Sequence, residues 1–128
     1  MILDTTFLND LLRKDNAALR KLDDLELNRE VLQTTTVTVF ELFRGVRLAH
    51  PENEGHINSL INQLIVFPFD LPSAKVGGRI DAQLRGKGLE IEPEDTMIAG
   101  IAMERKMAVL TRNTSHFSRV EGLKVHSY

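Results

Sequence analysis

The sequence predicts an α/β protein, a three-layer α/β/α sandwich around a mostly parallel central sheet. Short apolar or β-branched segments alternate along the chain with longer segments whose apolar residues recur at helical spacing, a pattern typical of parallel sheets covered by helices. The chain has 128 residues and is 42% hydrophobic, which is enough to bury one core. Because the chain has no repeat or low-complexity linker, we expect a single domain over residues 1–128.

The first elements follow from periodicity. Met1–Asp4 is short and apolar and is expected to be a buried strand. Thr5–Lys14 and Asp15–Leu27 have apolar residues three and four apart, which predicts two helices. Glu30–Val37 is rich in β-branched residues, which favour a second strand.

The middle of the chain repeats this alternation. We expect a helix over Thr38–His50, which Pro51 ends, and another over Pro51–Leu64. Ile65–Phe69 is a predicted strand, and Pro72–Arg85 is a predicted helix in which two consecutive glycines indicate close packing.

The last elements complete the sheet. Glu94–Lys106 is a predicted helix whose small residues, Ala99, Gly100 and Ala102, would allow a close approach to the sheet. Strands are predicted at Met107–Thr111 and Leu123–Val125.

Composition excludes several classes of protein. The formal net charge of -2 argues against a globally basic nucleic-acid binder, so any RNA contact requires a local basic patch. The absence of cysteine excludes disulfides, zinc–thiolate sites and thiol nucleophiles. The chain has no apolar run of transmembrane length and its start does not resemble a signal peptide, so we expect a cytoplasmic protein that does not enter a membrane.

Four polar residues are predicted to meet at one edge of the sheet. Asp4 ends the first strand, Glu41 lies in the first turn of the helix after the second strand, and Asp95 lies in the first turn of the helix before the fourth. That helix runs down the sheet and the strand after it runs back up, which brings Asn113 to the level of Asp95. Three carboxylates repel one another unless a cation or protons intervene, and a hard divalent ion takes such oxygen ligands. The pattern favours an Mg²⁺ or Mn²⁺ site able to activate water against a phosphodiester.

Each residue also has a purely structural interpretation. Thr38 and Glu41 fit a capping box, and Asp4 or Thr5 suits the cap of the first helix. Asp95 is favourable at a helix N-terminus, and Asn113 is a common turn residue.

Three segments in order, ILDTTFLNDLL, TVFELFRG and EDTMIAGIAMERKMAVLTRNTSHF, resemble the PIN-domain ribonucleases, and in particular the VapC toxins of toxin–antitoxin modules. The resemblance runs from Ile2 to Val125 and implies a PIN-like fold and an Mg²⁺- or Mn²⁺-dependent endoribonuclease. Asp4, Glu41 and Asp95 fall on the family's acidic metal-binding positions.

The resemblance extends to the surroundings of these acids. Asn113 falls on a fourth position that is Asp or Asn among relatives; as a neutral ligand it would position a water or a second metal ion. Thr6, Thr38 and Thr111 are candidates for contacts behind the metal ligands.

Partners also follow from the resemblance, which implies an RNA substrate, a VapB-like antitoxin and a homodimer. The apolar residues of the first, third and fourth helices are candidates for a dimer surface, and are alternatively core: Leu11, Leu12, Phe43, Val46 and Ile57.

Several cations could hold the RNA backbone, or lie on solvated helix faces. We single out Arg112, beside Asn113, then Arg44 and Arg79, with an ion pair to Glu41 as the alternative for Arg44. The wider set is Arg44, Arg47, Arg79, Arg85, Lys87, Arg112 and Arg119. His116 is the one histidine expected near the site. With a single Tyr and no Trp, we expect no aromatic platform for stacking bases.

Two other functions compete. A phosphatase could use Asp4 as its nucleophile, although Thr6 stands where such enzymes place an acid. A PIN-like domain that binds RNA or a partner without cleavage is the second, and the amide at Asn113 favours it.

Overall fold

One parallel sheet organises the chain. The structure is a computed structural model that describes residues 1–128. Its strands are β1 (Ile2–Leu3), β2 (Gln33–Thr35), β3 (Ile65–Phe67), β4 (Val109–Leu110) and β5 (Val125–His126). They pair in the order β3-β2-β1-β4-β5, and every pair is parallel. The predicted α/β class is confirmed, and the strands are shorter than predicted.

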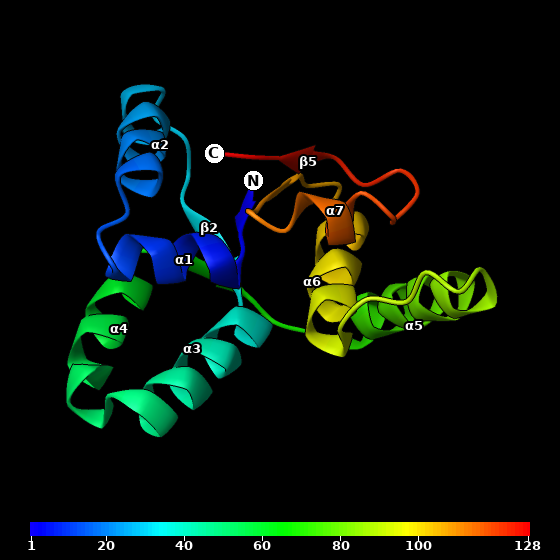
Figure 1. Ribbon diagram of the computed structural model, residues 1–128. Helices are drawn as coiled ribbons and strands as arrows, with labels where there is room; N and C mark the ends of the chain where they lie inside the picture. The colour runs from blue at the N-terminus through cyan, green and yellow to red at the C-terminus, as the bar shows by residue number, and fades with distance from the viewer.

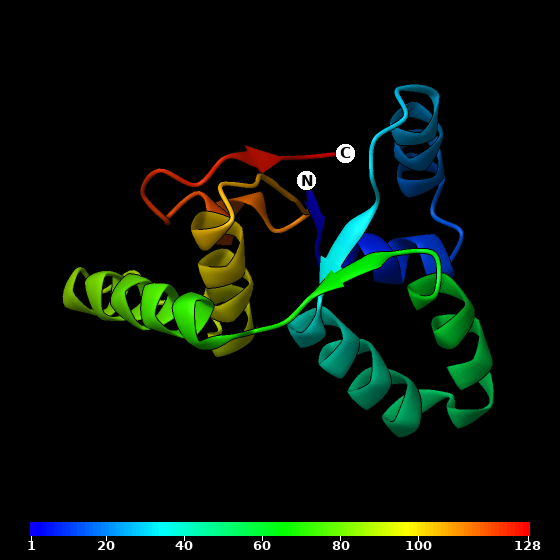
Figure 2. The ribbon, with the colours of Figure 1, turned by 180° about the vertical axis from the view of Figure 1, so that it is seen from behind.

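The helices form the two outer layers (Figures 1 and 2). They are α1 (Thr5–Leu12), α2 (Asn16–Leu27), α3 (Thr36–Ala49), α4 (Glu54–Ile61), α5 (Leu71–Gly86), α6 (Pro93–Glu104) and α7 (Thr114–Phe117), with a 3₁₀ turn η1 (Pro51–Asn53) before α4. In Figure 1, α1 to α4 gather on the left and α5 to α7 on the right. None of these helices combines the length and the apolar character that crossing a membrane requires.

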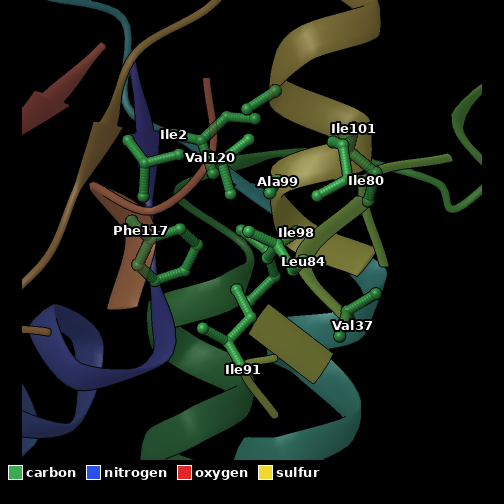
Figure 3. Close-up of a cluster of buried hydrophobic side chains, with 12 residues drawn as sticks. Ile2, Val37, Ile80, Leu84, Ile91, Ile98, Ala99, Ile101, Phe117 and Val120 are labelled. Atoms are coloured by element: carbon green, nitrogen blue, oxygen red, sulfur yellow. The ribbon is translucent and has the colours of Figure 1, made fainter. Parts of the chain in front are cut away.

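Alternating strand residues divide the core between the two layers. Ile2 and Val109 are fully buried in a cluster with residues of α5, α6 and α7 (Figure 3). Their neighbours Leu3 and Leu110 are buried in a second cluster with α1 to α4. Successive strand residues point to opposite faces of a sheet, so this division is the signature of a sandwich covered on both sides.

Helices α5 and α6 pack closely because glycine lies at their contact. A Cβ on Gly100 would lie 2.7 Å from the backbone oxygen of Ser73 and 2.8 Å from the Cα of Gly77. The small residue at Gly100 therefore permits contact with α5, and the prediction that it faces the sheet is wrong. The two glycines of α5 do mark close packing, through Gly77.

The start of α3 also differs from the prediction. The helix begins at Thr36, and the side chain of Thr35 caps it by accepting a hydrogen bond from the Thr38 backbone N–H at 3.1 Å. The capping box of Thr38 and Glu41 is therefore wrong, and Glu41 lies in the second turn of α3. Helix α7, which follows Asn113 directly, was not predicted.

Candidate active site

Asp4 is a buried carboxylate held by three donors. It caps α1, and its Oδ1 accepts hydrogen bonds from the Phe7 backbone N–H at 3.0 Å and the Thr6 hydroxyl at 2.7 Å. Its Oδ2 accepts one from the Thr111 hydroxyl at 2.5 Å. Burial raises the pKa of Asp4, while these hydrogen bonds oppose the rise and the charge of Asp95 adds to it.

Glu41 lies on the adjacent helix and is also partly desolvated. Its Oε1 accepts a hydrogen bond from the Thr5 hydroxyl at 2.7 Å. Burial raises the pKa of Glu41, the bond from Thr5 lowers it, and the charges of Asp95 and Glu94 raise it again. Thr38 is fully buried behind this pair, with its hydroxyl 3.2 Å from that of Thr5.

Asp95 lies in the first turn of α6, as predicted, and its Oδ2 is 3.2 Å from Nδ1 of His116. Burial raises the pKa of Asp95, and the interaction with His116 partly offsets this. His116 lies on α7, so the unpredicted helix brings a titratable group to the carboxylate. Because Asp95 also raises the pKa of Asp4 and of Glu41, the three acids share one electrostatic environment.

Asn113 joins this environment through its backbone. It stands at the cap position of α7, and its N–H donates to the Thr111 hydroxyl at 2.9 Å. That hydroxyl in turn donates to Asp4. The Asn113 side chain makes no hydrogen bond, which leaves its amide available to a water or ligand.

The donor chemistry of the site fits a hard divalent cation. Asp4, Glu41 and Asp95 offer oxygen ligands. Burial raises the pKa of each, so the charged form of these carboxylates is disfavoured in the free protein, and a bound cation would stabilise it. As the side chains stand, no three Asp, Glu, His or Cys residues are close enough to share one ion. Glu41 and Asp95 each use one carboxylate oxygen in the present hydrogen bonds, with Thr5 and His116 respectively.

Sequence reasoning found neither the role of Thr5 nor the contact of Asp95 with His116, although it placed His116 near the site. Thr5 follows Asp4 directly, and only its position next to the strand end signalled a role beyond capping. The contact between Asp95 and His116 joins residues 21 apart through a helix that the sequence did not predict. The other predicted threonines, Thr6 and Thr111, do contact Asp4.

Arg112, the first candidate for phosphate contact, forms ion pairs within the protein. Its guanidinium bonds Asp10 at 3.1 Å and Asp15 at 3.0 Å, and lies 4.9 Å from the centre of the Tyr128 ring. The Tyr128 hydroxyl donates to the same Asp10 at 2.7 Å. Two carboxylates and an aromatic ring thus engage Arg112 in the free protein, and its contact with a phosphate stays a prediction.

The other two candidates for phosphate contact, Arg44 and Arg79, have different surroundings. Arg44 bonds Glu94 at 3.1 Å and lies 3.9 Å from Glu41, so the ion pair expected as its alternative role is present. Arg79 is exposed on α5, which packs against α6 on the side away from α1 (Figure 1). Neither position shows a contact with Asp4.

The candidate dimer residues belong to the core. Ile57 is buried in the second cluster, and the other four pack against it: Leu11, Leu12, Phe43 and Val46. Ile57 is therefore core, and the other four, which are partly buried, pack against that core; a dimer surface at these residues stays a prediction.

The comparisons with known proteins agree with this geometry. The family model described as PIN domain matches residues 1–123. The chain is 33% identical over 104 residues to the tRNA(fMet)-specific endonuclease VapC of Salmonella typhimurium. The matched region covers 80% of this chain and 79% of that protein. It is 31% identical to the protein of the same name from Shigella flexneri, over 99% of this chain and 96% of that one.

A solved structure shows the same fold. DNA-bound VapBC from Salmonella typhimurium matches with a TM-score of 0.86 and 29% identity, over 98% of this chain and 96% of that chain. The sequence resemblance to PIN-domain proteins of the VapC group is confirmed by these matches. With the sheet order, the buried acids and the family match in agreement, the chain belongs to the PIN-domain family.

Proposed function

We propose that this protein is a metal-dependent endoribonuclease, the toxin of a toxin–antitoxin pair. The observation that carries the proposal is the group of three partly or fully buried carboxylates, Asp4, Glu41 and Asp95, whose pKa values burial raises at one edge of the sheet. A protein gains no stability from such a group, so its chemistry explains its presence. The relatives named as VapC endonucleases and the VapBC structures support the assignment.

Each residue has a role in the reaction. Asp4, Glu41 and Asp95 would hold Mg²⁺ or Mn²⁺, which when bound supplies an activated water and charge neutralisation at the phosphate. Thr6 and Thr111 fix the Asp4 carboxylate from both of its oxygens, so that its orientation is set before substrate arrives. Asn113 presents an unpaired amide that would orient the attacking water. Thr38 supports Thr5, which in turn holds Glu41.

The overall reaction is hydrolysis of an RNA phosphodiester. The oxygen of a water forms a bond to phosphorus, the bond from phosphorus to the 3′ oxygen breaks, and that oxygen takes up a proton. The products carry a 5′-phosphate and a 3′-hydroxyl. No covalent bond to the enzyme is required.

The phosphatase alternative lacks its acid. Such an enzyme needs an acid two residues after the nucleophile, and Thr6, which occupies that position, donates its hydroxyl hydrogen to Asp4. The binding-domain alternative is favoured by the present separation of the acids and by the amide at Asn113.

A protein partner has a place beside this site. A groove of about 260 Å³ runs between α1, α3 and α4, and Glu41 lies in its wall. A segment of a VapB-like antitoxin lying there would cover the carboxylate, which is how we propose the toxin is kept inactive. We place both proteins in the cytoplasm, in keeping with the absence of cysteine. A homodimer remains a prediction that light scattering tests.

The deciding experiment is RNA cleavage by the purified toxin alone. Initiator tRNA, the substrate in the names of two relatives, is the first RNA to test, beside a mixed structured pool. Reactions contain Mg²⁺, Mn²⁺ or EDTA. We expect cleavage with metal, none with EDTA, and none by Asp95→Asn, while Asp23→Asn on the exposed face of α2 cleaves normally. Metal binding by calorimetry without cleavage of any RNA would favour the binding-domain alternative.

A further inference from the structure

An exposed aromatic ring stands beside the candidate active site. Phe40 is 58% exposed, whereas Phe7 and Phe117 are fully buried. It directly precedes Glu41 on α3. Singly exposed apolar residues are common, so exposure alone does not distinguish Phe40; its position next to a candidate metal ligand makes it a candidate for contact with RNA.

The ring forms part of a small surface pocket that adjoins the acids. The pocket has a volume of about 420 Å³ and is lined by Thr36, Val37, Phe40, Pro93, Glu94 and Met97. Its two walls are the first turns of α3 and α6, which lie next to each other in Figures 1 and 2. Glu94 precedes Asp95, just as Phe40 precedes Glu41. The pocket residues Phe40 and Glu94 are therefore the sequence neighbours of two of the three acids, although the acids themselves do not line the pocket.

A cation stands at the rim of the pocket. The guanidinium carbon of Arg44 lies 5.1 Å from the centre of the Phe40 ring, and the same group bonds Glu94 at 3.1 Å. The Arg44 side chain is 47% exposed, so substrate can reach it from solvent. A flat aromatic surface with a neighbouring cation is the combination that single-stranded nucleic acid uses, since bases stack on the ring and the cation attracts the backbone.

We propose that Phe40 and this pocket bind a nucleobase next to the phosphate that is cut, with Arg44 contacting the adjoining backbone. The inference rests on the proposed ribonuclease function and names the substrate as RNA that is unpaired at the cut. A paired base would have both faces stacked and could not lie on Phe40. The expectation that the protein lacks an aromatic platform counted only Tyr and Trp, and this proposal replaces it because Phe40 is exposed.

A nucleobase fits better than a protein segment for two reasons. The pocket is lined by six residues, whereas a protein interface takes about 20 to 30 on each side. Arg44 also links the pocket to an acid, because it contacts both Glu94 in the pocket wall and Glu41, and it provides the charge that an RNA backbone needs.

The test measures directly whether a base of the RNA stacks on the protein. A short unstructured RNA that spans the mapped cut carries the fluorescent base 2-aminopurine at each flanking nucleotide in turn. It is titrated with Asp95→Asn protein, which leaves the RNA uncut. We expect fluorescence quenching at one of the two positions. Phe40→Ala in this background should abolish the quenching and weaken binding about 5- to 150-fold, the equivalent of one lost stacking contact. Phe40→Trp should retain both.

Controls separate this inference from its alternatives. Leu48→Ala, a change of an 82% exposed residue on the same helix, should affect neither signal. Unchanged quenching and affinity in Phe40→Ala would overturn the proposal. It would also be overturned if Phe40→Ala changed the molar mass measured by light scattering and left the RNA affinity intact, because a second copy of the chain would then be what covers the ring. Absence of any RNA cleavage by the unmodified protein would instead remove the ribonuclease function itself.

Discussion

The hydroxyl of Thr111 is the closest polar partner of Asp4, and it also accepts the Asn113 N–H. Thr111→Val keeps the shape of the side chain and removes both hydrogen bonds. Loss of a hydrogen bond to a charged group costs about 1.5–3 kcal/mol, so we expect cleavage to slow roughly 10- to 150-fold. The measurement is kcat/KM on the mapped substrate. Thr111→Ser, which retains the hydroxyl, should stay within a few-fold of the unmodified protein, and equal rates for the two variants would contradict the role of Thr111.

Tyr128 gives an optical signal of its own environment. It is the single Tyr in a chain without Trp, so absorbance at alkaline pH reports one residue. Burial, then the hydrogen bond to Asp10, raises its pKa to about 12. The folded state therefore binds the phenolic proton more tightly than the unfolded state, whose pKa is about 10. The stability that this provides is present below pH 10 and is lost as the pH rises from 10 to 12.

The same titration tests the contact with Asp10. We expect the folded protein to keep Tyr128 largely protonated at pH 11, and the denatured protein to ionise near pH 10. In Asp10→Asn the ionisation should move toward lower pH, because a charge that opposes it is removed. A midpoint near 10 in protein that circular dichroism shows to be folded would contradict the contacts of Tyr128 with Asp10 and Arg112.

Residue positions were easier to predict than residue contacts. The places of Asp4 and Asp95 follow from strand and helix ends, which period and capping residues reveal. The direction of the Arg112 side chain does not, because it depends on Asp10, which lies on another element and is far away in the sequence. The bond from Thr5 to Glu41 spans 36 residues and likewise depends on how α1 and α3 pack.

At the scale of elements, the contact between α5 and α6 depends on Gly100. A Cβ there would lie 2.7–2.9 Å from backbone atoms of Ser73 and Gly77, and backbone cannot move aside as a flexible side chain can. Gly100→Ala should destabilise the fold by about 1–3 kcal/mol, even though alanine favours helices. Urea unfolding followed by circular dichroism measures this.

Gly78 provides the matched control for that substitution. It also lies within a helix, α5, but a Cβ there would meet nothing within 4 Å. Gly78→Ala should therefore stabilise the protein by up to about 1 kcal/mol through helix propensity alone. The two substitutions are chemically identical and should have opposite signs; equal effects would show that helix propensity, and not close packing, dominates at Gly100.

The ends of elements show where local pattern stops being informative. The β-branched run Thr34–Val37 predicted a strand up to Val37, yet the strand ends at Thr35 and the helix begins at once. The side chain of Thr35 caps α3, a contact whose strength exceeds the weak β preference of the following residues. The error moved Glu41 by about half a turn in the prediction but left it on the correct helix.

At the scale of the whole molecule, the proposed RNA binding must overcome a formal net charge of -2. Most of the predicted cations are occupied in the structure. Four arginines form ion pairs with carboxylates, namely Arg44, Arg47, Arg85 and Arg112. Arg119 donates to the backbone carbonyls of Leu89 and Glu90. Arg79 and Lys87 are in none of the ion pairs.

This occupancy sets the salt dependence of RNA binding. Each phosphate neutralised on a single strand contributes about -0.7 to the slope of log K against log salt, so two or three contacts give a slope of about -1.4 to -2.1. Engagement of all seven predicted cations would give about -5. We expect the shallow slope for Asp95→Asn protein and a short single-stranded RNA, measured by fluorescence anisotropy between 50 and 300 mM salt.

A slope near -5 would mean that RNA displaces the protein's own carboxylates from their arginines. The arginines that form ion pairs in the free protein would then contact phosphates in the complex. A shallow slope would instead leave shape, the Phe40 pocket and the bound metal as the main sources of affinity. Arg44→Gln tests the contact proposed for Arg44 itself, because it should flatten the slope by about 0.7 if Arg44 contacts a phosphate and leave it unchanged if its bond to Glu94 persists in the complex.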